Sequence, residues 1–241
     1  MSTVQSTGDI DFILSSGFLA FGRHIGFLDG AVQVGVRPGR VFGTSSGALV
    51  GALWCGGLSP DAILAEVRSQ RPIDRMGMSW TPWRGVFSLA PLVSRLSELL
   101  PPRFEDLPIP LAVGVKRADG AFAFVESGPL APAVAASCAI PWVFEKVAVT
   151  FDGVTEACAD GGAVDRVGLS TWRARPQRSS RAVVHLVERS AGAVGSDDYS
   201  DVTVVRSGRS GAGFWSLGDV HSRVAETRAT TLAVLKPRVV G

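Results

Sequence analysis

The sequence lacks much of what several large classes of protein require. Its 241 residues include only three cysteines, Cys55, Cys138 and Cys158, which are odd in number and widely spaced. They form no Cys-x-x-Cys motif and no Cys/His cluster. We therefore expect neither a disulfide framework nor a zinc site, but reduced and buried thiols.

The sequence also has no large excess of charge of one sign and no long apolar run. The 24 Lys and Arg and 22 Asp and Glu leave a net charge of +2, so nucleic acid is not suggested as a partner. Only residues 173–181, with four arginines, are locally basic; we interpret them as a solvated loop, with contact to anionic lipid headgroups as the alternative. No run approaches the ~18 apolar residues of a spanning helix, and residues 1–11 are polar and acidic, unlike a secretory signal. These features predict a soluble, cytoplasmic protein.

The chain does contain enough apolar material for a well-buried sheet. Hydrophobic residues make up 46% and charged residues 19%, as is typical of a globular α/β protein. No linker or repeat divides the chain, so we expect a single domain over 1–241 with a frayed tail at 1–8. Apolar runs predict strands at 10–15, 40–44, 111–115, 121–125, 146–151, 154–158, 182–187 and 202–205. Helical patterns cover 18–34, 46–55, 59–69, 90–100, 129–139 and 219–235.

Residues 71–88 fit neither pattern. They contain Trp80, Trp83 and two methionines among prolines and glycines. Such a stretch is either a packed loop or a flap over a pocket, where exposed Trp and Met suit apolar substrates or a lipid interface.

The segment Gly43-Thr44-Ser45-Ser46-Gly47 lies between an apolar strand and a helix. This is the Gly-x-Ser-x-Gly pattern of a nucleophile elbow, a sharp turn that lifts the serine hydroxyl off the end of a sheet. Glycine is needed on both sides because the backbone passes close to itself there. The helix that follows directs its positive end at Ser45 and favours negative charge. The pattern alone also arises by chance, so its strand and helix context carries the functional interpretation.

An activated serine needs a base, and the sequence offers few histidines. His24, His185 and His221 lie in predicted helices or in an apolar strand, where a lone histidine is usually structural. The order Ser45, Asp160, His221 matches an α/β-hydrolase triad, but only one clear strand precedes the elbow here.

Asp160 is the stronger partner for Ser45. It follows an apolar strand and precedes two glycines, so its carboxylate should emerge at a tight turn. Partial desolvation would raise its pKa and allow it to accept the serine proton. The alternative is that Asp160 only satisfies an Asx-turn.

Four segments in order resemble the patatin-like phospholipase family, over about residues 10–170. A single one of these motifs is weak, but four in the right order are specific. They are the loop Ser15–Ala20, the elbow Gly43–Gly47, the small-residue stretch Ala133–Phe144 that contains Ile140-Pro141, and the motif Asp160-Gly161-Gly162.

The resemblance implies a three-layer α/β/α domain with a mainly parallel central sheet and a Ser–Asp dyad. Ser45 would be the nucleophile and Asp160 its base, and the backbone N–H groups of Ser16, Gly17 and Phe18 would form the oxyanion hole. The substrate would be an acyl lipid or phospholipid, with transient contact to a membrane surface and with no metal or cofactor. The motif glycines are Gly43, Gly47, Gly161 and Gly162.

The chain departs from the family pattern in the oxyanion loop. Ser15 and Ser16 stand in place of glycines, Leu19 in place of a basic residue and Ala20 in place of the last glycine. A serine can still supply a backbone N–H if its conformation is tolerated. Arg23, one helical turn further on, is a candidate for the missing charge. Residues 164–168 also differ, where the family tends to have Asp-Asn-x-Pro.

Two classes of function follow. One is a serine acyl hydrolase of the phospholipase A or lysophospholipase kind that works through an acyl-enzyme, with an acyltransferase as a variant. The other is a catalytically impaired lipid-binding or interaction domain. The sequence does not address oligomeric state.

Overall fold

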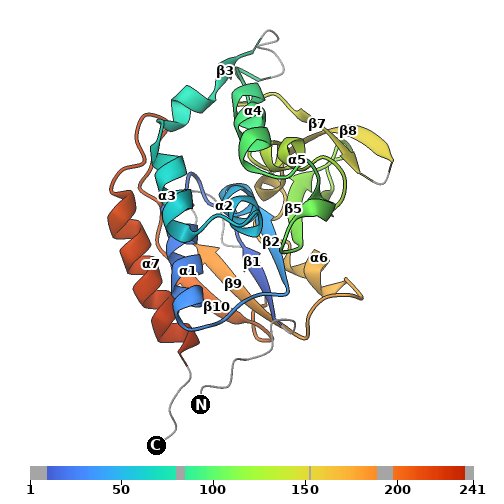
Figure 1. Cartoon of the computed structure of the whole chain (residues 1–241). Coiled ribbons are helices and arrows are strands. Elements are labelled where there is room, and N and C mark those ends of the chain that lie inside the picture. The colour runs from blue at the N-terminus through green and yellow to red at the C-terminus, as the bar shows by residue number, and fades with distance from the viewer. Residues whose placement is uncertain (1–9, 80–84, 152, 189–197, 237–241) are drawn as a thin grey trace, which may run out of the picture.

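A computed structural model describes residues 10–79, 85–151, 153–188 and 198–236 of the chain. A mainly parallel sheet runs through its centre (Figure 1) in the strand order β10-β9-β1-β2-β5-β8-β7, with β6 paired to β5. Neighbouring strands from β10 to β5 are parallel, whereas β6, β7 and β8 form the antiparallel side. The strands are β1 (Ile10–Leu14), β2 (Arg40–Thr44), β5 (Leu111–Lys116), β6 (Phe122–Val125), β7 (Val147–Phe151), β8 (Val154–Asp160), β9 (Arg181–Val187) and β10 (Thr203–Ser207).

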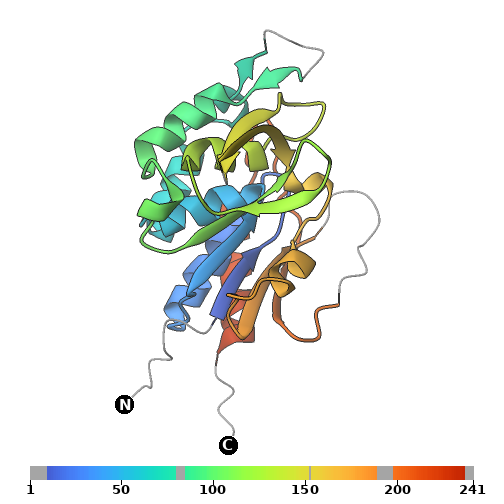
Figure 2. The ribbon, with the colours of Figure 1, turned by 90° about the vertical axis from the view of Figure 1, so that its right-hand side faces the viewer.

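Helices cover both faces of the sheet, but unequally. Side chains alternate along each strand, so that Phe12 and Leu14 of β1 join the larger apolar core and Ile13 joins the smaller one. The larger core contacts α1, α2, α3, α4 and α5, and the smaller core contacts α6 on the opposite side (Figure 2). The helices are α1 (Phe21–Gln33), α2 (Ser46–Cys55), α3 (Pro60–Arg68), α4 (Ala90–Leu99), α5 (Leu130–Ser137), α6 (Leu169–Arg173) and α7 (Val220–Leu235).

This architecture confirms the predicted three-layer α/β/α fold with a mainly parallel sheet. The strands predicted at 111–115 and 121–125 form the antiparallel pair β5–β6, and those predicted at 146–151 and 154–158 form the antiparallel pair β7–β8. Helix α1 also packs closely against α7. A Cβ added at Gly26 would lie only 2.3 Å from the carbonyl oxygen of Val224, so the contact requires glycine there. The glycines of α1 therefore provide the smooth stripe that their four-residue spacing indicates.

The segment 71–88 has more structure than its composition predicts. A 3-10 turn (Pro72–Arg75) is followed by the short antiparallel strands β3 (Gly77–Met78) and β4 (Phe87–Ser88). Trp80 and Trp83, on which the predicted flap rested, lie outside the described residues.

The order of the strands creates a crevice at one end of the sheet. Strand β1 has β2 on one side and β9 on the other, and all three run in the same direction. The chain leaves β1 toward β2 and leaves β9 toward β10, so the two connections diverge at the carboxyl ends of β1 and β9, which is where open α/β sheets bind ligands. None of the described helices is long and apolar enough to cross a membrane.

Candidate active site

Ser45 occupies a strained backbone conformation at the turn between β2 and α2. Its φ is 55° and its ψ is −121°, which is rare for a residue with a side chain and costs about 1–3 kcal/mol. In the described chain the other non-glycine residues with positive φ are Leu19 and Trp142. Leu19 lines the same cavity as Ser45, and Trp142 lies in a turn whose residues Ile140 and Phe144 line it too. Backbone strain therefore gathers around one site, as is common where function imposes a conformation.

The glycines of the elbow are required by close backbone contacts. A Cβ added at Gly43 would lie 2.7 Å from the Ala48 Cα, and one at Gly47 would lie 2.4 Å from the Leu14 carbonyl oxygen. Neither backbone atom can move without displacing the strand or the helix, so both positions exclude any side chain.

Two other serines hold the elbow in place. The Ser45 N–H donates to Ser137 Oγ at 2.8 Å, and the Ser137 hydroxyl donates in turn to the Gly114 carbonyl at 2.6 Å. The Ser46 hydroxyl donates to the Gly17 carbonyl at 2.7 Å. The elbow is thus tied to β5 through α5 and to the loop after β1. The sequence analysis did not identify Ser137 and Ser46 in these roles, although Ser137 lies in the family-like small-residue stretch.

Asp160 lies at the end of β8, buried next to Ser45. Its pKa is raised to about 6, chiefly because burial disfavours the charged carboxylate. Hydrogen bonds from the Ser45 side chain and the Gly162 N–H oppose this shift, and the latter is 2.7 Å long. The backbone N–H of Asp160 donates to the Ala139 carbonyl at 2.9 Å, which fixes the position of the residue. The carboxylate of Asp160 thus makes the tight turn to Gly162 and also meets the Ser45 side chain, so its turn contact leaves it able to face the serine.

The loop after β1 passes the elbow with two of its three predicted oxyanion donors available. The amides of Gly17 and Phe18 have no acceptor among the described residues. The Ser16 N–H, by contrast, donates to the Arg166 carbonyl at 2.7 Å. The prediction of Ser16 as a donor is corrected here, because its amide already has a partner within the fold.

The positive charge beside this loop comes from Arg166. Its Nη2 donates to the Ser16 carbonyl at 2.7 Å and to the Val187 carbonyl at 2.9 Å, so it joins the loop to β9. Arg23, the candidate substitute for the missing basic residue, instead donates to Glu226 at 2.7 Å and to the Arg209 carbonyl at 3.1 Å. The Arg23 side chain is thus committed to α7 and its preceding loop. Arg166 follows the Asp160 motif, in the segment where the sequence departs from the family pattern.

The histidines form no part of this arrangement. His24 and His185 are fully buried and face one another with 2.8 Å between their Nδ1 atoms, and His185 Nε2 lies 3.0 Å from Ser207 Oγ. Burial lowers the pKa of His24 to about 3 and holds the pKa of His185 well below its usual value. None of the three histidines, all of which the structure describes, lines the cavity at Ser45.

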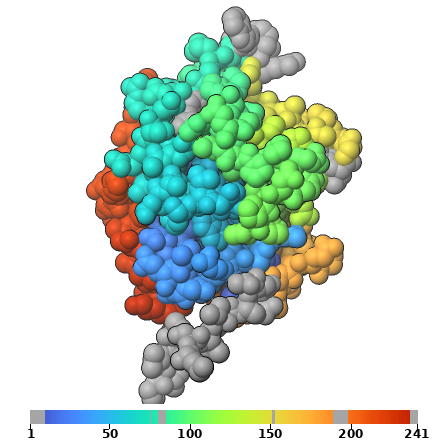
Figure 3. All heavy atoms as spheres, in the orientation of Figure 1, coloured from blue at the N-terminus to red at the C-terminus, as the bar shows by residue number. Residues whose placement is uncertain are grey.

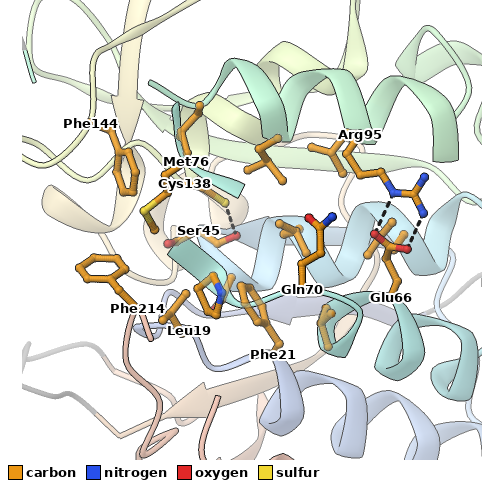
Figure 4. A pocket seen from close by; sticks show the side chains of 18 of the residues that line it. Leu19, Phe21, Ser45, Glu66, Gln70, Met76, Arg95, Cys138, Phe144 and Phe214 are labelled. Atoms are coloured by element: carbon orange, nitrogen blue, oxygen red, sulfur yellow. Dashed lines mark hydrogen bonds and ion pairs between the residues drawn. The ribbon is translucent and has the colours of Figure 1, made fainter. Parts of the chain in front are cut away.

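An apolar cavity extends from Ser45 between α2, α3 and α4 (Figure 4). Its volume is about 120 Å³, many times the ~10–15 Å³ that one water requires. Among the described residues that line it, Glu66 and Arg95 alone are charged. The apolar lining includes Phe18, Leu19, Phe21, Leu49, Leu53, Val67, Met76, Leu89, Leu92, Leu96, Leu99, Ile140, Phe144 and Phe214. In the described part of the chain, no group of three or more His, Cys, Asp or Glu residues could hold a metal ion.

Comparison with known proteins agrees with this geometry. Among solved structures, VipD from Legionella pneumophila matches 94% of this chain with a TM-score of 0.56 and 11% identity. ExoU of the Pseudomonas aeruginosa type III secretion system, solved in complex with SpcU, matches 98% with a TM-score of 0.54 and 13% identity. The chain spans 66% of the VipD chain and 53% of the ExoU chain, so these similarities concern the fold.

The sequence comparisons address the family directly. No curated protein sequence matches the chain. The patatin-like phospholipase family matches it over residues 12–171, which include the loop after β1, the elbow and Asp160. This chain therefore belongs to the patatin-like phospholipase family, a family of lipid hydrolases.

Proposed function

We propose that the protein is a serine hydrolase of acyl-ester lipids that works through a Ser45–Asp160 dyad. The observation that carries the proposal is the meeting of three features at one point. A strained serine, a buried carboxylate of raised pKa and the end of an apolar cavity lie together at the elbow. This combination suits a long apolar acyl group whose ester carbonyl stops at a nucleophile.

The first half of the reaction forms an acyl-enzyme. Ser45 Oγ attacks the ester carbonyl while Asp160 takes the hydroxyl proton, and the carbonyl oxygen becomes an oxyanion. The free amides of Gly17 and Phe18 and the positive end of α2 would stabilise that charge. Collapse of the intermediate breaks the bond to the leaving alcohol, which receives the proton from Asp160.

The second half releases the acid. Asp160 takes a proton from water, whose oxygen attacks the acyl-enzyme carbonyl, and Ser45 leaves with the proton returned from Asp160. A general base is most effective when its pKa lies near the working pH. A pKa of about 6 keeps Asp160 ionised at neutral pH and makes it more basic than an exposed carboxylate.

The geometry favours hydrolysis over the impaired binding domain. The altered loop keeps two amides free, and Arg166 and Ser46 hold two of its carbonyls. The loop with serines at positions 15 and 16 therefore keeps two of the three expected donors available, those of Gly17 and Phe18. An acyltransferase would use the same dyad, with an alcohol in the place of water.

Contact with a lipid surface is part of the proposal. The Trp142 side chain is 90% exposed, and Met78 and Trp215 are also exposed. Each is close in sequence to a cavity-lining residue, namely Ile140, Met76 and Phe214. Tryptophan favours the boundary between water and lipid, so these side chains would bring the cavity to a membrane or micelle.

We also propose a reducing, cytoplasmic location. The thiols Cys55, Cys138 and Cys158 are all free in the described structure, and two of them are buried. Disulfides are rare in the cytosol, where free buried cysteines persist.

The experiment is hydrolysis of p-nitrophenyl acyl esters and of phospholipids by purified protein. We expect turnover by the wild type and a loss of about 10⁴-fold or more in kcat/KM for Ser45→Ala. Ser97→Ala serves as a matched control, because Ser97 is an exposed serine of α4 that only bonds the Val93 carbonyl. Undiminished activity in folded Ser45→Ala would exclude the serine mechanism. A folded wild type without turnover would favour the binding domain.

A further inference from the structure

One ion pair interrupts the apolar wall of the Ser45 cavity. Arg95 of α4 binds Glu66 of α3 through two parallel hydrogen bonds, Nε to Oε1 at 3.0 Å and Nη2 to Oε2 at 2.7 Å. This bidentate geometry is the strongest arrangement of the two side chains and it fixes both in place. Packing alone does not explain why a charged pair lines a cavity whose other side chains are mainly apolar.

The pair lies on the side of the cavity away from Ser45. Figure 4 shows Ser45 toward one side of the cavity, with Phe144 and Phe214 beyond it, and the two bonds between Arg95 and Glu66 on the opposite side. Helix α2 contributes Ser46, Leu49 and Leu53 along the cavity. Leu53 is about two turns beyond Ser45, or roughly 12 Å along the helix axis, which is the extended length of an acyl chain of about eight to ten carbons.

The pair lines the cavity and also reaches solvent. The Arg95 side chain is 37% exposed and that of Glu66 is 14% exposed, so the pair has an inner and an outer side. Helices α3 and α4 both contribute to the outer face of the molecule shown in Figure 3. Methylene groups that extended past the pair would strip water from two charges or break their bonds, and either outcome is unfavourable.

We propose that the Glu66–Arg95 pair closes the acyl cavity opposite Ser45 and thereby sets the longest acyl chain that the enzyme accepts. This inference rests on the proposed hydrolase function and adds its substrate class, esters of medium-length acyl chains. Glu66 and Arg95 are specificity-determining residues that do not touch the reacting atoms. Their pairing, rather than either charge alone, forms the end wall.

The test compares chain-length profiles on p-nitrophenyl esters from C4 to C16. In Glu66→Ala/Arg95→Ala the wall is removed, and we expect the ratio of kcat/KM for C16 over C8 to rise by about tenfold or more. Arg95 Nη1 also donates to Glu98 at 2.7 Å. The charge swap Glu66→Arg/Arg95→Glu is therefore made in a Glu98→Gln background, where it rebuilds a pair across the same two positions without a second carboxylate beside it, and it should return the ratio toward the value of Glu98→Gln alone.

A second ion pair supplies the matched control. Arg117 and Glu156 are bonded at 2.7 Å with side chains 39% and 12% exposed, nearly the same as Arg95 and Glu66, but they join β5 to β8 and do not line the cavity. Arg117→Ala/Glu156→Ala should lose similar stability and leave the chain-length ratio unchanged. A shift of the ratio in this control would attribute the effect to general loosening and overturn the proposal.

The outcomes separate this inference from the proposed function. An active double variant with an unchanged C16 over C8 ratio would refute the end wall and leave the hydrolase intact. If the double variant does not fold, Arg95→Met keeps the length of the side chain, removes the pair and should shift the ratio in the same direction.

Binding provides a readout that does not need turnover. The measurement is displacement of a bound fluorescent fatty acid by octanoate or by palmitate in a Ser45→Ala background. If the pair limits the length of the cavity, palmitate should bind more weakly than octanoate. Loss of that preference in Arg95→Met is the expected result. Equal binding of the two acids by the parent would contradict the proposal even for a protein without hydrolase activity.

Discussion

Two buried polar clusters in this molecule have pKa values shifted by burial, yet only one of them borders a cavity. Ser45 lines the apolar cavity, and Asp160 is buried behind it in hydrogen-bond contact with the Ser45 side chain. His24 and His185 are buried between α1 and the sheet, in contact with one another and with Ser207. Burial raises the pKa of Asp160 and lowers the pKa of both histidines, so each group is pushed toward its neutral form.

The difference shows that a perturbed pKa is insufficient to identify a catalytic group. The Asp160 carboxylate keeps two donors that favour its charged form, including the nucleophile that it would activate. His24 and His185, in contrast, do not line the cavity, so neither ring reaches the space where a substrate would bind. A base must reach both a reacting group and substrate. The predictions below test the contrast between the two clusters, and their expected effects become smaller in the order given.

The largest effect is expected for Asp160→Asn. An amide of the same size cannot accept the Ser45 proton, so kcat/KM should fall by about 10³–10⁴-fold. The same change should stabilise the fold at pH 8 by roughly 1–3 kcal/mol, because it removes a buried charge. The sign follows from the raised pKa: Asp160 stabilises the fold below pH 3.8, and that contribution is lost as the pH rises through about 6. Ester hydrolysis and urea unfolding at pH 8 measure the two effects. An Asp160→Asn protein with undiminished activity would contradict the Ser45–Asp160 dyad.

The pH dependence of activity should report the same carboxylate. Because Asp160 must be ionised, kcat/KM should rise with pH through a midpoint near 6 and fall about tenfold for each pH unit below it. A pH profile of the wild type between pH 4.5 and 8.5 measures this. A midpoint near 7 that vanishes in folded His221→Gln would assign the titration to a histidine instead.

A smaller effect is expected for Arg166, which holds the loop after β1 that we propose as the oxyanion loop. Arg166→Met removes the donors to the Ser16 and Val187 carbonyls and should lower kcat by about tenfold with little change in KM. Arg166→Lys keeps one charged donor and should restore part of kcat. Steady-state kinetics with a parallel thermal melt distinguish this from a merely structural role, which would move the melting temperature and leave kcat unchanged.

No change in kcat/KM is expected for the histidine cluster. His24→Gln and His185→Gln should each keep the activity of the folded protein and lose about 1–3 kcal/mol of stability. Since both folded-state pKa values lie below the unfolded value of 6.5, the stability from the neutral pair is present above pH 6.5 and is lost as the pH falls below it.

Urea unfolding between pH 7.5 and 4.5 measures that dependence. In His24→Gln/His185→Gln the decline below pH 6.5 should be shallower than in the wild type. Loss of turnover in either folded single variant would contradict the separation of the two clusters.

The parts of the site that could be predicted are those that local sequence determines. The elbow consists of five consecutive residues, and close backbone contacts require its two glycines. The motif, with a strand before it and a helix after it, was therefore enough to predict the turn. The mainly parallel sheet was implied by the family resemblance, and the apolar strand β9 agrees with it because both of its faces are covered. Asp160 emerged because it ends a strand and starts a tight turn.

The rest depends on contacts between residues distant in sequence. The prediction of Ser16 as an oxyanion donor was wrong because its N–H donates a hydrogen bond to the carbonyl of Arg166, 150 positions further along the chain. The apolar faces of α2 and α4 predict burial, but periodicity cannot tell packed core from the wall of a cavity. Helix α6 was missed because its five residues are too short for a periodic pattern.

The most direct test of the Ser45–Asp160 dyad is covalent labelling by a fluorophosphonate, followed by intact mass and peptide mapping. We predict one adduct on Ser45 in the wild type and in His24→Gln, His185→Gln and His221→Gln, much slower labelling in Asp160→Asn, and none in Ser45→Ala. An adduct that forms at the wild-type rate in Asp160→Asn, or is lost in a folded histidine variant, would contradict the dyad.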